Sequence, residues 1–127
     1  MKHLGKIFII TSALNLGIGV LTVQNPKPVL AQVNCQAPQS VNEANDCYQQ
    51  ADTTLNAVYL QLLYGLRGER QQQLIAAEQG WIQYRDANCS FRASKFDGAM
   101  ARLFYFSCLD RMTRERTQQV QEELQGR

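Results

Sequence analysis

Four cysteines constrain the fold of this 127-residue chain more than any other feature: Cys35, Cys47, Cys89 and Cys108. In a small exported domain, an even number of cysteines is typical of disulfide bridges, which compensate for a small core. A zinc site is the alternative, but the sequence has no CxxC pair and its single histidine, His3, lies near the start of the chain. We therefore predict two disulfides, no metal site and no cofactor.

The first 31 residues have the organisation of a secretory signal peptide. Basic residues near the start are followed by an uncharged apolar run over residues 7–23, and Val29 and Ala31 suit the positions that signal peptidase reads. The alternative is an uncleaved anchor, but the run is shorter than the roughly 20 apolar residues that span a bilayer. We expect residues 1–31 to be removed and residues 32–127 to form one domain, periplasmic or secreted, without membrane attachment.

The positive charge of the precursor comes from this leader. The whole chain has thirteen Lys and Arg residues against eleven Asp and Glu, a net charge of +2. Lys2, Lys6 and Lys27 precede the predicted cut, so ten basic residues remain against eleven acidic ones and the net charge becomes about −1. Proteins that bind nucleic acid normally carry a basic patch or stripe. The composition therefore gives no reason to expect nucleic acid as a partner.

Apolar residues recur at spacings of three and four along three segments, which is the pattern of amphipathic helices. The first helix is predicted over about 41–66, where Ser40 and Glu43 have the spacing of a capping box. The others are predicted over about 69–92 and 99–124. The positions expected to face the core are Val41, Ala44, Tyr48, Ala51, Leu55, Val58 and Leu62, then Leu74, Ala77, Trp81, Tyr84 and Asn88, and finally Leu103, Phe106, Leu109, Met112, Val120 and Leu124.

Short turns between these helices predict an all-α fold. We expect a small three-helix antiparallel bundle, formed by a long helical hairpin plus a third helix and stapled by two disulfides. Four cysteines allow three pairings. The pairing in sequence order, Cys35–Cys47 and Cys89–Cys108, closes two short loops and is the one that we favour. Cys47–Cys89 is the open alternative, because these two residues lie at a similar height in an antiparallel hairpin.

Two sequence motifs, each next to a cysteine, allow a comparison with known protein families. Cys47 is followed by ADxxLNxxY, which begins at Ala51, and LxxAEQGWIxYRDxxC ends at Cys89. Cys108 and Arg116 follow in order. The motifs and their spacing resemble the lysozyme inhibitor LprI-like N-terminal domain family over roughly residues 35–124. The resemblance implies an exported helical domain that inhibits a lysozyme, a cell-wall hydrolase, by protein–protein contact.

The polar and aromatic residues of these motifs have a structural and a functional interpretation. They are Asp52, Asn56, Tyr59, Gln79, Trp81, Tyr84, Arg85, Asp86 and Arg116. The charged residues could form a binding patch or an acid–base pair, but we favour an ion-pair network between helices, because arginine can donate to carboxylates bidentately. The aromatic residues could stack on sugars, but their place on the apolar stripes favours the core. We expect the two amides to form interhelical hydrogen bonds.

The predicted mature region contains no histidine, so it cannot build a Ser–His or Cys–His nucleophile. We therefore predict no catalytic residues and a protein that is not an enzyme. Two loops have chemistry suited to a protein partner, residues 67–70 and residues 92–95. A lysozyme cleft contains two carboxylates, which a cationic loop can plug. Arg92, Lys95 and Phe96 are the candidate contact residues, because the second predicted disulfide would pre-organise their loop.

The alternative function is a non-catalytic structural or interaction domain of the cell envelope with another protein partner. An exposed apolar patch would favour that interpretation. The candidates for the patch are Phe91, Phe96, Phe104 and Tyr105, which crowd around the start of the third helix. The same patch would serve a homodimer contact, so we expect a monomer or a weak homodimer.

Overall fold

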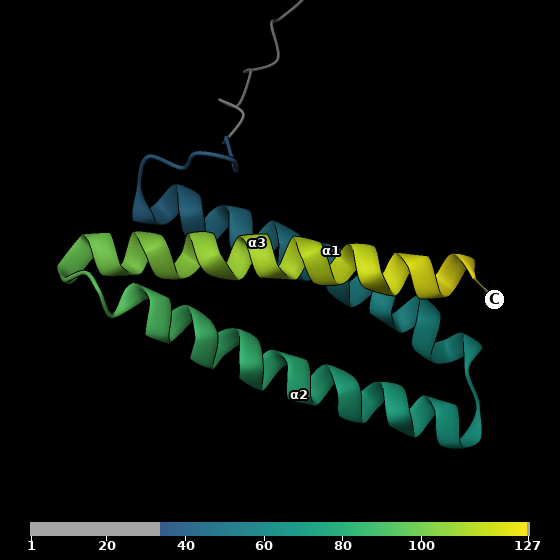
Figure 1. Ribbon diagram of the computed structural model, residues 1–127. Helices are drawn as coiled ribbons and strands as arrows, with labels where there is room; N and C mark the ends of the chain where they lie inside the picture. The colour runs from purple at the N-terminus through teal and green to yellow at the C-terminus, as the bar shows by residue number, and fades with distance from the viewer. Residues whose placement is uncertain (1–33, 127) are drawn as a thin grey trace, which may run out of the picture. The chain divides into compact units, whose positions relative to one another are not determined.

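Residues 34–126, the part of the chain that the computed structural model describes, form three α-helices and no strand (Figure 1). The helices are α1 (Val41–Gly65), α2 (Gly68–Ala93) and α3 (Gly98–Gln125). The predicted all-α fold is confirmed, and each helix begins and ends within one residue of its predicted limit. None of these helices has a stretch long and apolar enough to cross a bilayer. The predicted signal peptide, residues 1–31, lies outside the described residues.

The start of α1 is fixed by side chains that accept hydrogen bonds from free backbone N–H groups. Ser40 Oγ accepts from the backbone N–H of Glu43 at 3.2 Å. The Glu43 carboxylate in turn accepts from the backbone N–H of Gln39 at 2.6 Å, one residue before the position that a capping box predicts. The carboxylate also lies in the first turn, where it complements the positive end of the helix dipole.

Replacing Ser40 by alanine is expected to destabilise the domain by about 1 kcal/mol, because one backbone N–H of the first turn loses its acceptor. Urea denaturation followed by circular dichroism measures this difference. Ser40→Asp is the matched control, since an aspartate at this position also caps the helix and should keep most of the stability. Equal losses in the two variants would show that the hydroxyl does not act as a cap.

Each turn between helices ends at a glycine in the left-handed region of backbone conformation. Gly68 has a φ of 59° and Gly98 a φ of 56°. Residues with a Cβ rarely adopt this conformation, so glycine suits both positions. Backbone carbonyls at the end of α1 accept hydrogen bonds from side chains that follow the helix. Arg67, in the turn, donates to Tyr64 O at 2.7 Å, and Gln71, at the start of α2, donates to Leu63 O at 3.2 Å. These contacts fix the first chain reversal.

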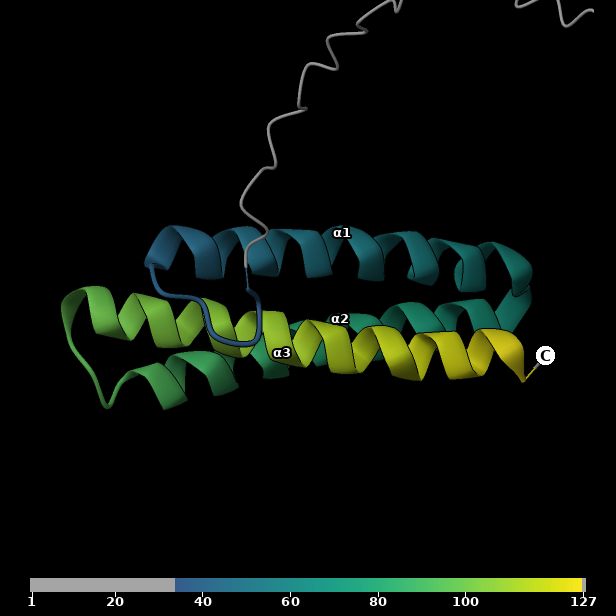
Figure 2. The ribbon, with the colours of Figure 1, turned by 90° about the horizontal axis from the view of Figure 1, so that it is seen from above.

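The chain reverses direction at each of the two turns, so α1 and α3 are parallel and α2 is antiparallel to both (Figures 1 and 2). The predicted helical hairpin with a third helix is confirmed. The most extensive packing, however, joins α1 to α3, and α1 contacts α2 least. In both views the turn between α2 and α3 extends past the first turn of α1. We call α2, this turn and α3 the α2–α3 hairpin; its turn end projects from the bundle, and the hairpin named below is always this one.

The apolar core consists of two clusters. The first lies toward the α1–α2 turn and contains Leu55, Leu62, Leu66 and Val120, with Val58, Leu74, Trp81 and Leu124 packed against it. The second lies toward the α2–α3 turn and contains Cys89, Cys108, Leu109 and Met112, with Tyr48, Tyr105 and Phe106 packed against it. Along every helix, the residues between these clusters include charged or hydroxyl side chains. The bundle therefore has a polar layer between two apolar ones.

The inward face of α2 differs from the predicted stripe. Tyr84 was expected in the core but is 63 % exposed, and Ala77 is also exposed. The residues that follow them, Glu78 and Arg85, are 8 % and 5 % exposed. The inward face of α2 thus lies one residue further along the sequence than predicted. The reason is that Cys89 is fixed in the core by its disulfide, and Arg85 and Glu78 lie on the same face of the helix as Cys89.

Both disulfides follow the favoured pairing. Cys35 is bonded to Cys47, and Cys89 to Cys108. The alternative that joined Cys47 to Cys89 is wrong. The first bridge attaches the lead-in before α1 to the second turn of that helix. The second bridge joins the end of α2 to α3 across the loop of residues 94–97, and so closes the projecting end of the hairpin.

Candidate functional site

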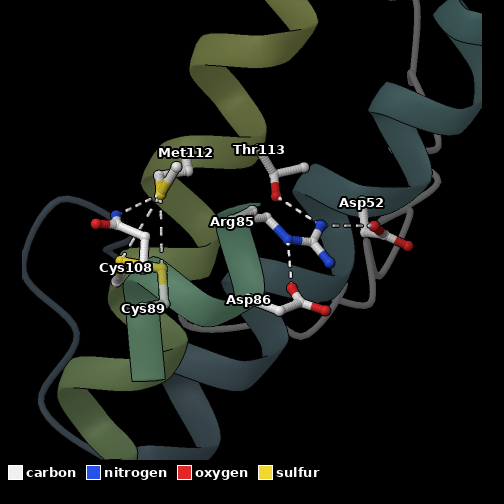
Figure 3. Close-up of polar contacts among 8 residues, drawn as sticks. Asp52, Arg85, Asp86, Cys89, Cys108, Met112 and Thr113 are labelled. Atoms are coloured by element: carbon white, nitrogen blue, oxygen red, sulfur yellow. Dashed lines mark hydrogen bonds and ion pairs between the residues drawn. A yellow bond between two sulfur atoms is a disulfide. The ribbon is translucent and has the colours of Figure 1, made fainter. Parts of the chain in front are cut away.

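Arg85 is the centre of the polar layer and connects all three helices (Figure 3). Its Nε donates to Asp86 at 2.8 Å, and Nη1 donates to the hydroxyl of Thr113 on α3 at 3.3 Å. Nη1 also lies 3.6 Å from a carboxylate oxygen of Asp52 on α1. The structure therefore brings Asp52, Arg85 and Asp86 together, and it adds Thr113, which was not among the predicted residues.

The guanidinium of Arg85 lies over two aromatic rings. It is 5.3 Å from the ring centre of Tyr48 and 5.0 Å from that of Trp81. Burial alone would lower the pKa of Arg85, but the hydrogen bond to Asp86 and the nearby negative groups outweigh it, so the pKa is raised. Burial raises the pKa of the Tyr48 hydroxyl. Arg85 thus remains a cation inside the bundle, with carboxylates and aromatic faces as its partners.

A second ion pair joins α2 to α3. Both Nε and Nη2 of Arg116 lie 2.9 Å from one carboxylate oxygen of Glu78. Arg116 also donates to Gln119 at 3.2 Å and lies 5.8 Å from the ring centre of Trp81. Tyr59 on α1 is near the same carboxylate: burial raises the pKa of its hydroxyl, and the charge of Glu78 raises it further. Arg116 and Arg85 therefore both contact Trp81, which lies between the two ion pairs.

The remaining motif residues do not join this network as predicted. Asn56 donates to Asp52 at 3.2 Å, so its hydrogen bond lies within α1 and not between helices. Gln79 is exposed on the outer face of α2. Tyr84 is exposed as well, and it borders an open groove between α2 and α3. Gln79 and Tyr84 face outward because the inward face of α2 lies one residue further along the sequence than predicted.

A sulfur cluster supports the projecting end of the hairpin (Figure 3). Met112 Sδ lies 3.7 Å from Cys89 Sγ and 4.0 Å from Cys108 Sγ, and Asn88 Nδ2 lies 3.2 Å from the same thioether. Cys89 is completely buried. The cluster attaches the last turn of α2 firmly to α3.

Beyond this cluster is a surface that we call the tip, residues 91–104. Phe96 stacks on Phe104 with ring centres 4.0 Å apart. Phe91 is 70 % exposed, and Met100 and Phe104 are about half exposed. The tip also carries the exposed cations Arg92, Lys95 and Arg102. The structure thus places the predicted contact residues Arg92, Lys95 and Phe96 on one projecting surface, together with apolar side chains that solvent reaches. Tyr105, which was predicted to join the patch, packs into the second core cluster.

A family model described as lysozyme inhibitor LprI matches residues 34–120. The chain belongs to this family. The matched range contains both disulfides, the Arg85 network and the tip. A search of curated proteins and a search of solved structures each found no match.

The core of this LprI domain contains polar residues of α3 that the sequence analysis missed. Asp110, Thr113 and Thr117 are all buried. Thr117 donates to the carbonyl of Thr113 at 2.9 Å, and the Asp110 carboxylate accepts from Arg114 at 2.8 Å. Their spacing could have revealed them, because they continue the stripe that ends at Val120 at intervals of three and four. A search for apolar residues alone passes over them.

Burial raises the pKa of Asp110, although Arg114 opposes the shift. The folded chain therefore holds this proton more tightly than the unfolded chain does. The stability that Asp110 contributes is complete below its ordinary pKa of about 4 and is lost as pH rises through the raised value.

Asp110→Asn is consequently expected to make the LprI domain more stable than wild type at pH 7 and about equally stable at pH 3. The amide oxygen can still accept the hydrogen bond of Arg114, but no charge is buried. Thermal unfolding at a series of pH values measures the difference. Asp46→Asn, at an exposed position on α1, is the control, because it removes a carboxylate that is not buried. A constant difference for Asp110→Asn across the pH range would contradict the assignment.

Proposed function

We propose that this LprI domain is a non-catalytic inhibitor that binds a lysozyme by protein–protein contact through its tip. The observation that carries the proposal is the family match over residues 34–120, which includes the whole tip. The family is named for lysozyme inhibition, and the tip projects past α1 and carries exposed cations and aromatic rings.

Charge and exposure support the tip as the contact surface. A lysozyme cleft contains two carboxyl groups. The tip carries three cations, Arg92, Lys95 and Arg102, against one carboxylate, Asp97. Phe91 offers an aromatic anchor of the kind that dominates the binding energy of many interfaces. The cations would pair with the carboxylates of the cleft, and the aromatic residues would fill its apolar parts.

The tip is also held in one conformation before binding. The disulfide Cys89–Cys108 closes its base, and the stack of Phe96 on Phe104 closes its loop. The loop is further fixed by the Ser94 hydroxyl, which donates to Phe91 O at 2.7 Å. A pre-organised loop loses less conformational entropy on binding, so more of the contact energy appears as affinity.

The same observations support export of the domain. Two disulfides are typical of proteins outside the reducing cytosol. We propose that residues 1–31 are a signal peptide and that residues 32–127 act in the periplasm or after secretion, where a lysozyme would be met.

A turnover assay with cell-wall substrate tests the proposal. The oxidised protein, purified after export, is titrated against chicken-type and goose-type lysozymes, and the reduced protein is the control. We expect dose-dependent inhibition of at least one enzyme, and a loss of inhibition on reduction because the base of the tip opens. The absence of inhibition at high micromolar concentration would sink the inhibitor proposal.

That outcome would favour a second candidate function, an interaction domain with another envelope protein. The observation that favours it is the exposed apolar surface of the tip, where Phe91, Met100 and Phe104 are all accessible. Exposed apolar side chains in one place are typical of contact surfaces whichever partner they meet.

A further inference from the structure

An open groove of about 370 Å³ runs between α2 and α3, along the side of the hairpin. It is lined by Trp81, Tyr84, Asn88 and Arg92 from α2, and by Arg111, Met112, Glu115, Arg116 and Gln119 from α3. Only Arg92 belongs to the tip as well, so most of the groove is separate from the proposed lysozyme contact.

The walls of the groove combine aromatic faces, amides and cations. Trp81 and Tyr84 are three residues apart on α2 and are therefore neighbours on its surface. Asn88 and Gln119 supply amides from the two walls. Most of the lining is polar, so the groove suits a small ligand that offers many hydrogen-bonding groups beside a flat apolar face.

The charge of the groove is positive. Arg116 is engaged with Glu78 behind the groove, and Arg111 pairs with Glu115 at 2.7 Å. The Arg111–Glu115 pair is half exposed at both ends, so it contributes little to stability and Arg111 can turn to a ligand at low cost. Arg92 forms no ion pair with any residue in the described range. The lining thus contains three guanidinium groups and one carboxylate, and Glu78 outside the lining balances Arg116, so one positive charge remains.

We propose that this groove binds a saccharide that bears a carboxylate. The apolar faces of the sugar rings pack on the exposed ring of Tyr84, beside Trp81, whose own ring already has Arg85 and Arg116 over it. The carboxylate accepts paired hydrogen bonds from Arg111 or Arg92, the geometry for which a guanidinium is suited. The amides of Asn88 and Gln119 bond hydroxyl or acetamido groups. This proposal does not rest on the lysozyme proposal, because it concerns a different ligand and the groove shares only Arg92 with the tip.

The composition of the groove favours a saccharide over an acidic peptide. Peptides bind by adding to a sheet edge, by placing apolar side chains in pockets of a groove or, when they are acidic, by pairing with clusters of arginine. The arginines of this groove suit an acidic group on either ligand, so the choice between them rests on the other side chains of the lining. The described helices offer no sheet edge, and Met112 is the one aliphatic side chain among the described residues that line the groove. Sugar rings, in contrast, need flat faces and scattered hydrogen-bonding groups, and the groove supplies both.

Trp81 provides the measurement, because it is the single tryptophan of the chain. Its fluorescence is followed while the oxidised, exported protein is titrated with four probes. Two are carboxylate-bearing saccharides: the disaccharide of N-acetylglucosamine with N-acetylmuramic acid, and trigalacturonic acid. The others are neutral chitobiose and a tetraglutamate peptide. We expect saturable changes with one or both acidic saccharides and at least about tenfold weaker binding of chitobiose, which lacks the carboxylate that forms charge-assisted hydrogen bonds. The peptide has carboxylates but no sugar ring to pack on Tyr84, so its binding should also be at least about tenfold weaker.

Single substitutions locate the binding. Arg111→Ala and Tyr84→Ala are each expected to weaken binding of the acidic saccharide about tenfold. Both residues are exposed on the bundle, so the variants should fold, and circular dichroism checks this. Arg70→Ala, which removes an exposed arginine outside the groove, should leave binding unchanged. The groove variants should also leave lysozyme inhibition unchanged, which separates failure of this proposal from failure of the other.

Any of the following results would overturn the proposal: no saturable response to either acidic saccharide, binding of tetraglutamate as tight as that of the saccharides, or unaltered binding in both groove variants. Equal affinity for chitobiose would also overturn it, because the carboxylate would then play no part.

Discussion

Replacing Arg92 and Lys95 together by alanine is expected to weaken inhibition of the target lysozyme by about 100-fold or more. Each cation that pairs with a carboxylate in a desolvated cleft contributes about 1.5–3 kcal/mol, and 1.4 kcal/mol corresponds to a tenfold change in affinity. Both side chains are exposed in the free domain, so their removal should not affect folding. The inhibition constant from turnover assays measures the effect.

A charge-matched variant is the control for this experiment. Arg70→Ala with Arg111→Ala removes the same net charge from exposed positions outside the tip. It should change the inhibition constant less than about threefold, because exposed charges distant from an interface act mainly through long-range steering, which salt screens. Similar losses in the two double variants would mean that net charge, and not the tip, determines inhibition. Unaltered inhibition by Arg92→Ala with Lys95→Ala would show that the cations of the tip do not contact the lysozyme.

Arg85→Ala is expected to cost about 3 kcal/mol of the free energy of unfolding, the largest loss that we predict for a single substitution. The variant removes the hydrogen bonds to Asp86 and to the completely buried Thr113, and it leaves a space between Tyr48 and Trp81. The loss lies at the lower end of the range for buried pairs, because Asp52 and Asp86 are partly exposed and water can reach them. Urea denaturation of the oxidised protein measures it.

Arg111→Ala is the matched control for Arg85→Ala. Both arginines are on helices and paired with a carboxylate, but the side chain of Arg85 is 6 % exposed and that of Arg111 is 50 % exposed. We expect the control to cost less than about 0.5 kcal/mol, as is usual for exposed pairs. Equal costs would contradict the view that the polar layer, and not ion pairing in general, holds the three helices together.

Much of the fold could be predicted because its determinants are local. The three helices followed from apolar spacing, and the two disulfides followed from loop lengths. The rotation of α2 could not be predicted in this way, because hydrophobic spacing favoured Tyr84 over Arg85 for the core. What decides the rotation is the long-range disulfide of Cys89 together with partners on α1 and α3 that satisfy Arg85. Apolar spacing contains no information about such partners.

The candidate sites also depend partly on local sequence and partly on how the helices pack. The contact loop with Arg92, Lys95 and Phe96 stays a prediction, made from its charge, its aromatic neighbours and the adjacent cysteine. That this loop projects past α1 depends on how three helices align, which the sequence does not state. The groove was not anticipated either, because it requires Tyr84 to face outward, and the sequence analysis had placed that side chain in the core.

If the tip inhibits by filling the cleft of a lysozyme, a ligand that already occupies the cleft must weaken its binding. Calorimetric titration of the lysozyme with the oxidised protein tests it most directly, with the cleft either empty or occupied by tri-N-acetylglucosamine. We expect saturable one-to-one binding to the empty cleft and a loss of at least about 100-fold in affinity when the oligosaccharide fills it. Binding of equal affinity to the filled cleft would mean that the domain contacts the enzyme elsewhere and that the tip does not enter the cleft.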